Sequence, residues 1–183
     1  MISRRRLLIA AAATGCTGLV PREQLAEWRG KALGARASIS VVGQGPMARN
    51  ALRAARDTVM RIERYFSLFD VNSTLTELNA TGRITMPPEF IRLVDLTQEV
   101  YIDTGGLFDP TIQPLFRLYS NSRTSPSSSE LKQLSRSIGW DKVTRVGRRL
   151  ELTEPGMALT FNGIAQGFAT DRVCEVLSAH GYD

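Results

Sequence analysis

Two long segments with the periodicity of amphipathic helices constrain the fold of this chain more than any other feature. In Met47–Phe66, apolar residues recur at three- and four-residue steps, with arginines and acidic residues between them. Pro87–Thr104 has the same spacing, with a second proline near its start and Gly105-Gly106 directly after its end. Its predicted buried face consists of Leu93, Leu96, Val100 and Tyr101. Both helices need other elements to cover their apolar faces.

Shorter elements surround these helices. Runs of β-branched or apolar residues between turn residues predict strands at Arg36–Val42, Lys142–Val146, Arg149–Leu152 and Met157–Phe161, the middle two forming a hairpin. Further helices are predicted at Ser73–Asn79, Glu130–Ile138 and Gly163–Ala179. This mixture of helices and hairpin strands defines the α+β class. Because the chain ends directly after a helix, we expect the domain to be incomplete at Asp183.

The first sixteen residues have the composition of an export signal. A basic run is followed by a short apolar stretch, Leu7–Ala13, and by small residues. Ser3-Arg4-Arg5 followed by Leu7-Leu8 resembles a twin-arginine signal. We therefore expect export to the periplasm. We divide the chain into a leader at 1–16, a linker at 17–33 and a domain that begins at 34 and runs to 183.

Two ways of processing this leader are open. Ala11-Ala12-Ala13 offers a small-residue cleavage site. Alternatively, Ala13-Thr14-Gly15-Cys16 resembles a lipobox, which would place a lipid on Cys16 and anchor the protein to the inner membrane.

Charge and residue counts exclude several other functions. The net charge of +5 owes three units to Arg4, Arg5 and Arg6, and the remaining excess is too small for a surface that tracks phosphates, so no nucleic-acid partner is expected. Two cysteines and one histidine, His180, exclude a four-cysteine zinc site and any site with several histidines. We interpret Cys174 as a small packing residue of the last helix.

Gly105–Leu115 is the first segment whose residues could bind a ligand. A double glycine ends a helix, and Phe108-Asp109-Pro110-Thr111 follows. Asp109 precedes a proline, which favours an extended backbone, and its carboxylate is suited to cap a helix that starts at Pro110. The alternative interpretation is that Phe108 and Asp109 border a ligand, which Asp109 fixes by hydrogen bonds.

Thr160–Asp171 is the second such segment. A predicted strand leads through a turn of small residues, Asn162–Gly167, into a helix. Free backbone N–H groups and the dipole at a helix start favour an anion such as a pyrophosphate, and glycine lets it approach the backbone. A tight strand-to-helix packing turn explains the same glycines. A third segment, Ser67–Asn79, reads by itself as a capped loop before a short helix.

Together, these segments resemble the ApbE family of FAD:protein FMN transferases. The matching stretches are Ser73–Asn79 (STLTELN), Gly105–Leu115 (GGLFDPTIQPL) and Thr160–Asp171 (TFNGIAQGFATD), with Leu33-Gly34 at the place of a Met-Gly element. The resemblance implies an ApbE-like, T-fold-related domain. It also implies that FAD and Mg²⁺ bind, that FMN passes to a threonine or serine hydroxyl of a partner protein, and that AMP leaves.

The resemblance also implies roles for individual residues. The implied flavin-nucleotide contacts are Leu33, Phe69, Leu107, Phe108, Asp109 and Thr160. Gly163 stands where a backbone carbonyl approaches the metal. The family's remaining metal ligands match no residue here, and no catalytic residue is assigned.

Two positions depart from the family pattern. Thr160 stands in place of an Asp, which removes a charge but keeps a hydrogen-bonding group, and Gln166 replaces a Lys or Glu. The leading hypothesis is an exported FAD:protein FMN transferase whose partner is a flavoprotein of a respiratory complex. The alternatives are a flavin-binding maturation factor without catalytic activity, which the two departures fit, and an inactive truncated product.

Overall fold

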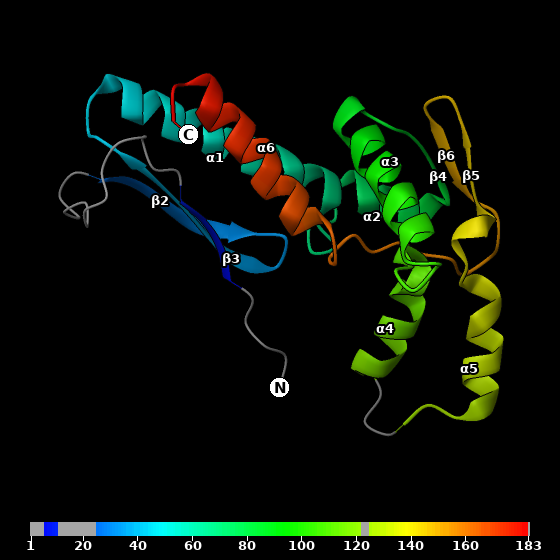
Figure 1. The fold of residues 1–183 in the computed structure, drawn as a ribbon. Helices are drawn as coiled ribbons and strands as arrows, with labels where there is room; N and C mark the ends of the chain where they lie inside the picture. The colour runs from blue at the N-terminus through cyan, green and yellow to red at the C-terminus, as the bar shows by residue number, and fades with distance from the viewer. Residues whose placement is uncertain (1–5, 11–24, 122–124, 183) are drawn as a thin grey trace. The chain divides into compact units, whose positions relative to one another are not determined.

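The computed structural model describes residues 6–10, 25–121 and 125–182, with side chains from residue 25 onward. The chain forms two compact units (Figure 1). Unit 1 consists of Met1–Phe69 and Ala165–Asp183, and unit 2 consists of Asp70–Ile164. Each unit has its own three-stranded sheet, and the mixture of helices and strands agrees with the predicted α+β class.

The sheet of unit 1 has the strand order β1-β3-β2. Strand β3 (Ala35–Val42) confirms the strand predicted at Arg36–Val42, and β1 (Arg6–Ala10) pairs with it in parallel. Strand β2 (Leu25–Ala32) pairs antiparallel with β3, from Leu25 opposite Val42 to Ala32 opposite Ala35. Strand β2 thus lies within the predicted linker at 17–33, which is wrong there, and β1 lies within the predicted leader at 1–16. The polar residues of β2 alternate with partly buried ones because β2 is an edge strand with one exposed face.

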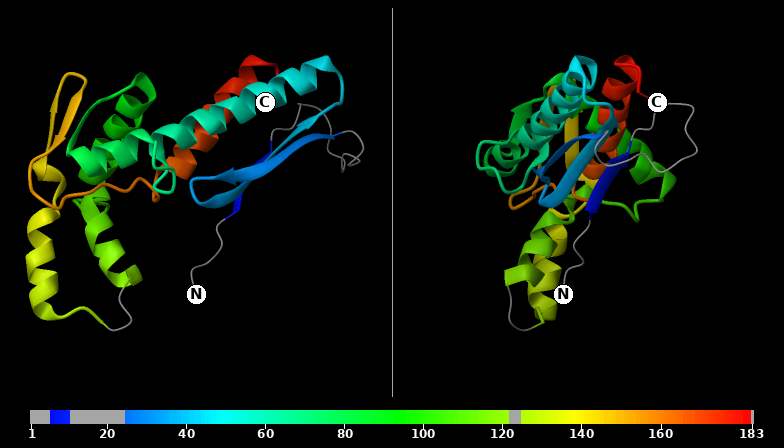
Figure 2. Two further views of the ribbon diagram at one scale, coloured as in Figure 1. Left: turned by 180° about the vertical axis from the view of Figure 1, so that it is seen from behind. Right: turned by 90° about the vertical axis from the view of Figure 1, so that its left-hand side faces the viewer.

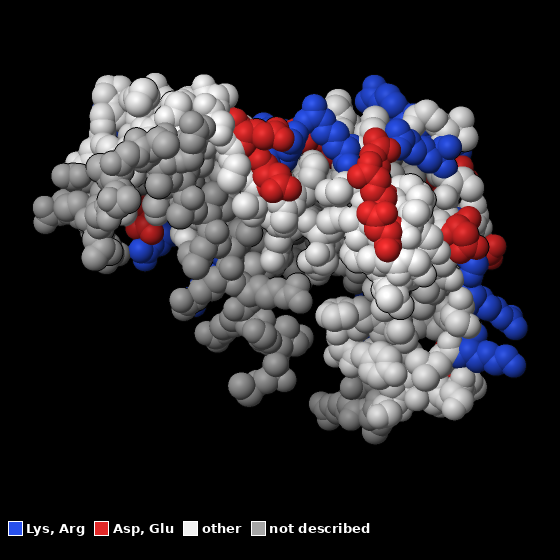
Figure 3. Space-filling view, viewed as in Figure 1, with Lys and Arg blue, Asp and Glu red and all other residues white. Residues whose placement is uncertain are grey.

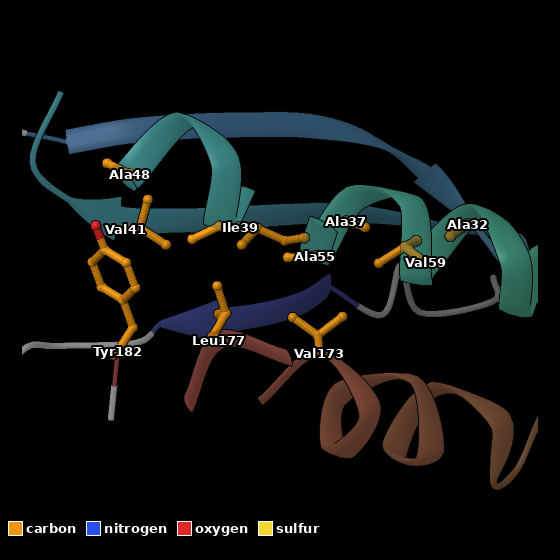
Figure 4. Packing of buried hydrophobic residues seen from close by; sticks show 11 residues of the cluster. Ala32, Ala37, Ile39, Val41, Ala48, Ala55, Val59, Val173, Leu177 and Tyr182 are labelled. Carbon is orange, nitrogen blue, oxygen red and sulfur yellow. The ribbon is translucent and has the colours of Figure 1, made fainter. Parts of the chain in front are cut away.

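Helices α1 (Pro46–Phe66) and α6 (Ala165–Ala179) cover one face of this sheet, side by side (Figures 1 and 2). Pro46 occupies the first helical position, where its fixed φ suits a helix start. Figure 4 shows the core between sheet and helices, to which β3 contributes alternate side chains. The core residues of this layer are Ala32, Ala37, Ile39, Val41, Ala48, Ala51, Ala55, Val59, Val173, Leu177 and Tyr182.

The described residues of unit 2 form four α-helices and a small antiparallel sheet. Helices α2 (Thr74–Thr81), α3 (Pro88–Asp103) and α5 (Ser128–Leu134) fall where helices are predicted. Strands β5 (Val143–Val146) and β6 (Arg149–Leu152) form the predicted hairpin, and β4 (Arg83–Thr85) pairs with β6 on its other side. Helix α4 (Gln113–Asn121) follows the Asp109-Pro110 turn and was not predicted.

Two predictions for unit 2 are corrected. The buried face of α3 consists of Phe90, Leu93, Val94 and Thr97. Leu96, Val100 and Tyr101 are only partly buried. The buried face of the helix lies three to four residues nearer its N-terminus than predicted. Met157–Phe161 is extended but joins no sheet. Phe161 is buried and stacks edge to face on Phe90, with ring centroids 5.7 Å apart, so the apolar run serves the core.

Surface features bear on several predictions. On the face drawn in Figure 3, the described basic side chains are interspersed with acidic ones rather than gathered into one stripe. Cys174 is exposed on α6, so its interpretation as a packing residue is wrong. Within the described part of the chain, none of the helices has the length and apolarity to cross a membrane. The residues proposed for lipidation and cleavage, Ala11–Cys16, lie outside the described residues.

Candidate flavin site

The double glycine after α3 turns the chain toward Phe108. Gly105 and Gly106 have φ of 58° and 82°, a left-handed conformation that glycine adopts without steric cost. The Gly106 N–H donates to the Tyr101 carbonyl over 2.8 Å, which closes the helix end. The Phe108 N–H then donates to the Thr104 hydroxyl, with N and Oγ1 3.1 Å apart. The backbone of the Phe108 turn is thus fixed by the last turn of α3.

Asp109 caps the 3-10 helix Pro110–Ile112, as one of the two interpretations predicted. Its Oδ1 accepts from the Thr111 N–H at 2.8 Å and from the Thr111 hydroxyl at 2.6 Å. Thr111 is fully buried, and its Oγ1 also accepts from the Gly139 N–H at 2.8 Å. The other carboxylate oxygen of Asp109, Oδ2, receives no hydrogen bond from the described residues. The cap therefore uses one oxygen and leaves the second for a ligand, so both interpretations are compatible.

The Thr160 segment lies directly against this turn. The Thr160 N–H donates to the Pro110 carbonyl at 2.8 Å, and the Thr160 hydroxyl accepts from the Asn162 N–H at 3.3 Å. A Cβ placed on Gly163 would lie 3.2 Å from Cε2 of Phe108, so the Phe108 ring rests against the Gly163 backbone. Unit 2 thus brings Phe108, Asp109, Thr160 and Gly163 together. Leu107 beside them is 92% exposed.

Leu33 and Phe69 belong to unit 1, where the structure also brings them together. Leu33 and Gly34 form the turn between β2 and β3, with φ of 51° and 73°. A Cβ on Gly34 would lie 2.5 Å from Cε2 of Phe69, so the ring lies on the Gly34 backbone. Phe69 is 72% exposed, whereas Leu33 is 5% exposed. The aromatic ring is therefore the accessible part of this pair, and Leu33 offers a ligand little surface.

The described residues do not form a metal site by themselves. No group of three or more His, Cys, Asp or Glu side chains suitable for a metal ion occurs within 25–121 and 125–182. The single backbone carbonyl of Gly163 does not supply the oxygen ligands that Mg²⁺ requires. The described residues therefore do not fit a complete Mg²⁺ site.

Three residues that hold these segments were missed from the sequence. The Asn79 side chain hydrogen-bonds to both the N–H and the carbonyl of Leu159. The Thr111 hydroxyl donates a hydrogen bond to Asp109, and the Glu63 carboxylate accepts one from the Leu33 N–H. Asn79 is the last residue of the STLTELN stretch that resembles the family, and this position was the sequence signal that could have drawn attention to it. Glu63 stands among the charged residues of a long helix, and no local pattern distinguishes it from them.

The described fold is that of known flavin transferases. It matches a Thermotoga maritima ApbE protein with a TM-score of 0.76 and 27% identity, covering 86% of this chain and 53% of that one. The Pseudomonas stutzeri flavinyl transferase ApbE matches in fold with a TM-score of 0.77 at 23% identity, over 87% of this chain and 54% of that chain. These matches define the chain as an ApbE-type α+β domain.

The family follows from the sequence comparison. The ApbE family model matches residues 33–183, and the chain belongs to the ApbE family. A Chlamydia pneumoniae protein named FAD:protein FMN transferase is 24% identical over 133 residues, which are 67% of this chain and 42% of that protein. The chain thus spans about half the length of the relatives that it matches.

Proposed function

We propose that this chain is the flavin-binding part of an exported FAD:protein FMN transferase. One observation carries the proposal: Gly105–Leu115 and the first five residues of Thr160–Asp171, two segments that resemble the family's FAD contacts, meet in unit 2. Phe108 packs on Gly163, and the Pro110 carbonyl accepts from the Thr160 N–H. Membership of the ApbE family and the name of the Chlamydia pneumoniae relative, FAD:protein FMN transferase, support the choice of this reaction.

The proposed reaction moves FMN from FAD to a hydroxyl group. The oxygen of an acceptor threonine or serine forms a bond to the phosphorus that carries riboflavin. The bond between that phosphorus and the bridging pyrophosphate oxygen breaks, and AMP leaves with the bridging oxygen. The hydroxyl proton passes to solvent or to a base outside the described residues. Positioning and charge stabilisation dominate catalysis of such a transfer.

The described residues would bind and orient FAD rather than perform this step. The exposed ring of Phe69 offers a flat apolar surface, and the Oδ2 oxygen of Asp109 offers a hydrogen-bond acceptor. Within unit 2, Thr160 and the Gly163 backbone would border the ligand beside Asp109. Mg²⁺ belongs to the proposal for the complete protein, and we assign it no step because its ligands are not among the described residues.

The proposal places the protein in the periplasm. Support comes from the twin-arginine-like start and from the lipobox-like Ala13–Cys16, which would add an inner-membrane anchor. An exported transferase of this kind would act on a threonine- or serine-bearing flavoprotein of a respiratory complex.

The test uses the complete product of the gene with FAD, Mg²⁺ and a threonine-bearing flavoprotein domain. The expected result is a mass gain of one FMN on the acceptor, which is absent when the acceptor threonine is replaced by valine. A protein that leaves both FAD and acceptor unchanged would contradict the proposal.

A second candidate is a flavin-binding maturation factor without catalytic activity. Thr160 and Gln166 favour it, because both positions lack the charged side chain that the family carries near the ligand. In the same experiment, this candidate predicts tight FAD binding with no mass gain on the acceptor.

A further inference from the structure

The turn between β2 and β3 holds an unfavourable backbone conformation. Leu33 has φ of 51°, and among the described residues it is the non-glycine residue with positive φ. A side chain with a Cβ disfavours this region, and outliers of this kind persist where the surrounding structure enforces them. The hairpin ladder ends at the pair Ala32–Ala35, so pairing within the ladder does not reach the turn residues themselves.

A side chain from α1 supplies the missing support. The Leu33 N–H donates to the Glu63 carboxylate, although thirty residues separate them. Leu33 is 5% exposed, so its N–H has little access to water, and an unpaired buried N–H is unfavourable. The hydrogen bond therefore favours the left-handed conformation over alternatives that would leave the N–H unpaired.

The Leu33-Gly34 turn then determines where Phe69 lies. Its ring rests on the Gly34 backbone, where a Cβ would overlap Cε2 at 2.5 Å. The Phe69 N–H donates to the Ser67 hydroxyl at 3.1 Å, which fixes the backbone of the segment. A shift of the Leu33-Gly34 turn would remove the surface on which the ring lies, while Phe69 remains 72% exposed for a ligand.

We propose that Glu63 is a positioning residue for FAD, acting through the Leu33-Gly34 turn on the Phe69 ring. This proposal rests on the proposed function, because it assumes that Phe69 contacts FAD. Glu63 touches the turn and not the ligand, so its loss should weaken FAD binding equally in the ground state and the transition state. The expected signature is a raised KM for FAD with an unchanged kcat.

The test compares variants of Glu63 in the complete gene product by calorimetric FAD titration and by transfer kinetics. Glu63→Gln keeps an acceptor oxygen and should retain FAD affinity within about threefold of wild type. Glu63→Ala removes the acceptor and should weaken FAD binding about tenfold. Glu63→Asp, whose carboxylate is one methylene too short to reach the Leu33 N–H, should weaken FAD binding by a similar factor. It replaces the alanine variant in the test if that variant does not fold. Asp57→Ala, an exposed carboxylate on the same helix, should change nothing.

A double-mutant cycle tests the route through Phe69. Once Phe69→Ala has removed the ring, Glu63→Ala should weaken FAD binding less than twofold further, about the size of ordinary non-additivity. Full additivity would overturn the proposal, as would wild-type affinity in Glu63→Ala. Wild-type protein that does not bind FAD would instead overturn the proposed function, and the role of Glu63 with it.

Discussion

The Asn79 side chain hydrogen-bonds to both backbone groups of Leu159, as a neighbouring strand would in a sheet. Its Nδ2 donates to the Leu159 carbonyl at 2.9 Å, and its Oδ1 accepts from the Leu159 N–H at 2.7 Å. Leu159 is fully buried, so both backbone groups would otherwise be unpaired. Through this pair, α2 fixes the segment that delivers Thr160 to the site.

We expect Asn79→Ala to destabilise the protein by about 2–4 kcal/mol, since it leaves a buried N–H and a buried C=O of Leu159 without partners. Urea unfolding followed by circular dichroism measures the change. Asn121→Ala, at an exposed asparagine of α4, is the control and should have little effect. Equal stability of the two variants would show that water replaces the Asn79 amide.

Gly163 should be sensitive to a single methyl group. In Gly163→Ala the new Cβ would lie 3.2 Å from Cε2 of Phe108, so the ring must move by a few tenths of an ångström. We expect FAD affinity to fall about three- to tenfold, as small displacements of a packed ring cost about 1 kcal/mol. FAD titration measures this effect.

Gly167→Ala is the matched control, because a Cβ at Gly167 meets no atom within 4 Å. That substitution lies inside α6 and should stabilise the protein by about 1 kcal/mol. In a Phe108→Ala background, Gly163→Ala should lose its effect on FAD affinity. A persistent effect would mean that the glycine backbone itself approaches the ligand.

The long helices and the β5–β6 hairpin could be predicted because period and turn residues determine them locally. Strand β2 could not, because Glu27, Arg29 and Lys31 give this edge strand the composition of a polar linker. The strand predicted at Met157–Phe161 is wrong because its apolar run pairs with the Asn79 side chain and the Pro110 carbonyl instead of a sheet.

The same limit applies to the site. The Asp109 cap was predictable because its partner, Thr111, lies two residues away. Contacts such as Phe108 on Gly163 depend on tertiary packing between distant segments, and the family resemblance implied only that each residue lies near a ligand or metal. Nothing in the local sequence shows that Glu63 bonds the Leu33 backbone.

Thr111 should be more sensitive to loss of its hydroxyl than to loss of its methyl group. Its buried Oγ1 donates to Asp109 Oδ1 at 2.6 Å and accepts from the Gly139 N–H at 2.8 Å. Thr111→Val keeps the shape but removes both bonds, and we expect a loss of about 2–3 kcal/mol and weaker FAD binding. Thr111→Ser keeps both bonds and should lose only about 1 kcal/mol for the missing methyl. The opposite order in thermal unfolding would show that the site depends on packing alone.

Helix α5 should weaken as the pH falls. The Ser127 hydroxyl donates to Glu130 Oε2 at 2.6 Å and the Ser127 N–H donates at 2.8 Å, and these two bonds hold the pKa of Glu130 below its ordinary value. A carboxylate whose pKa is lower in the folded state stabilises the fold above its unfolded pKa, and this contribution is lost as the pH falls through the folded pKa. We expect an NMR titration to place the Glu130 midpoint below that of a glutamate in an unstructured peptide. In Ser127→Ala, which removes the hydroxyl bond, the Glu130 midpoint should rise toward that of the unstructured peptide, and an unchanged midpoint would show that the Ser127 hydroxyl does not lower the pKa.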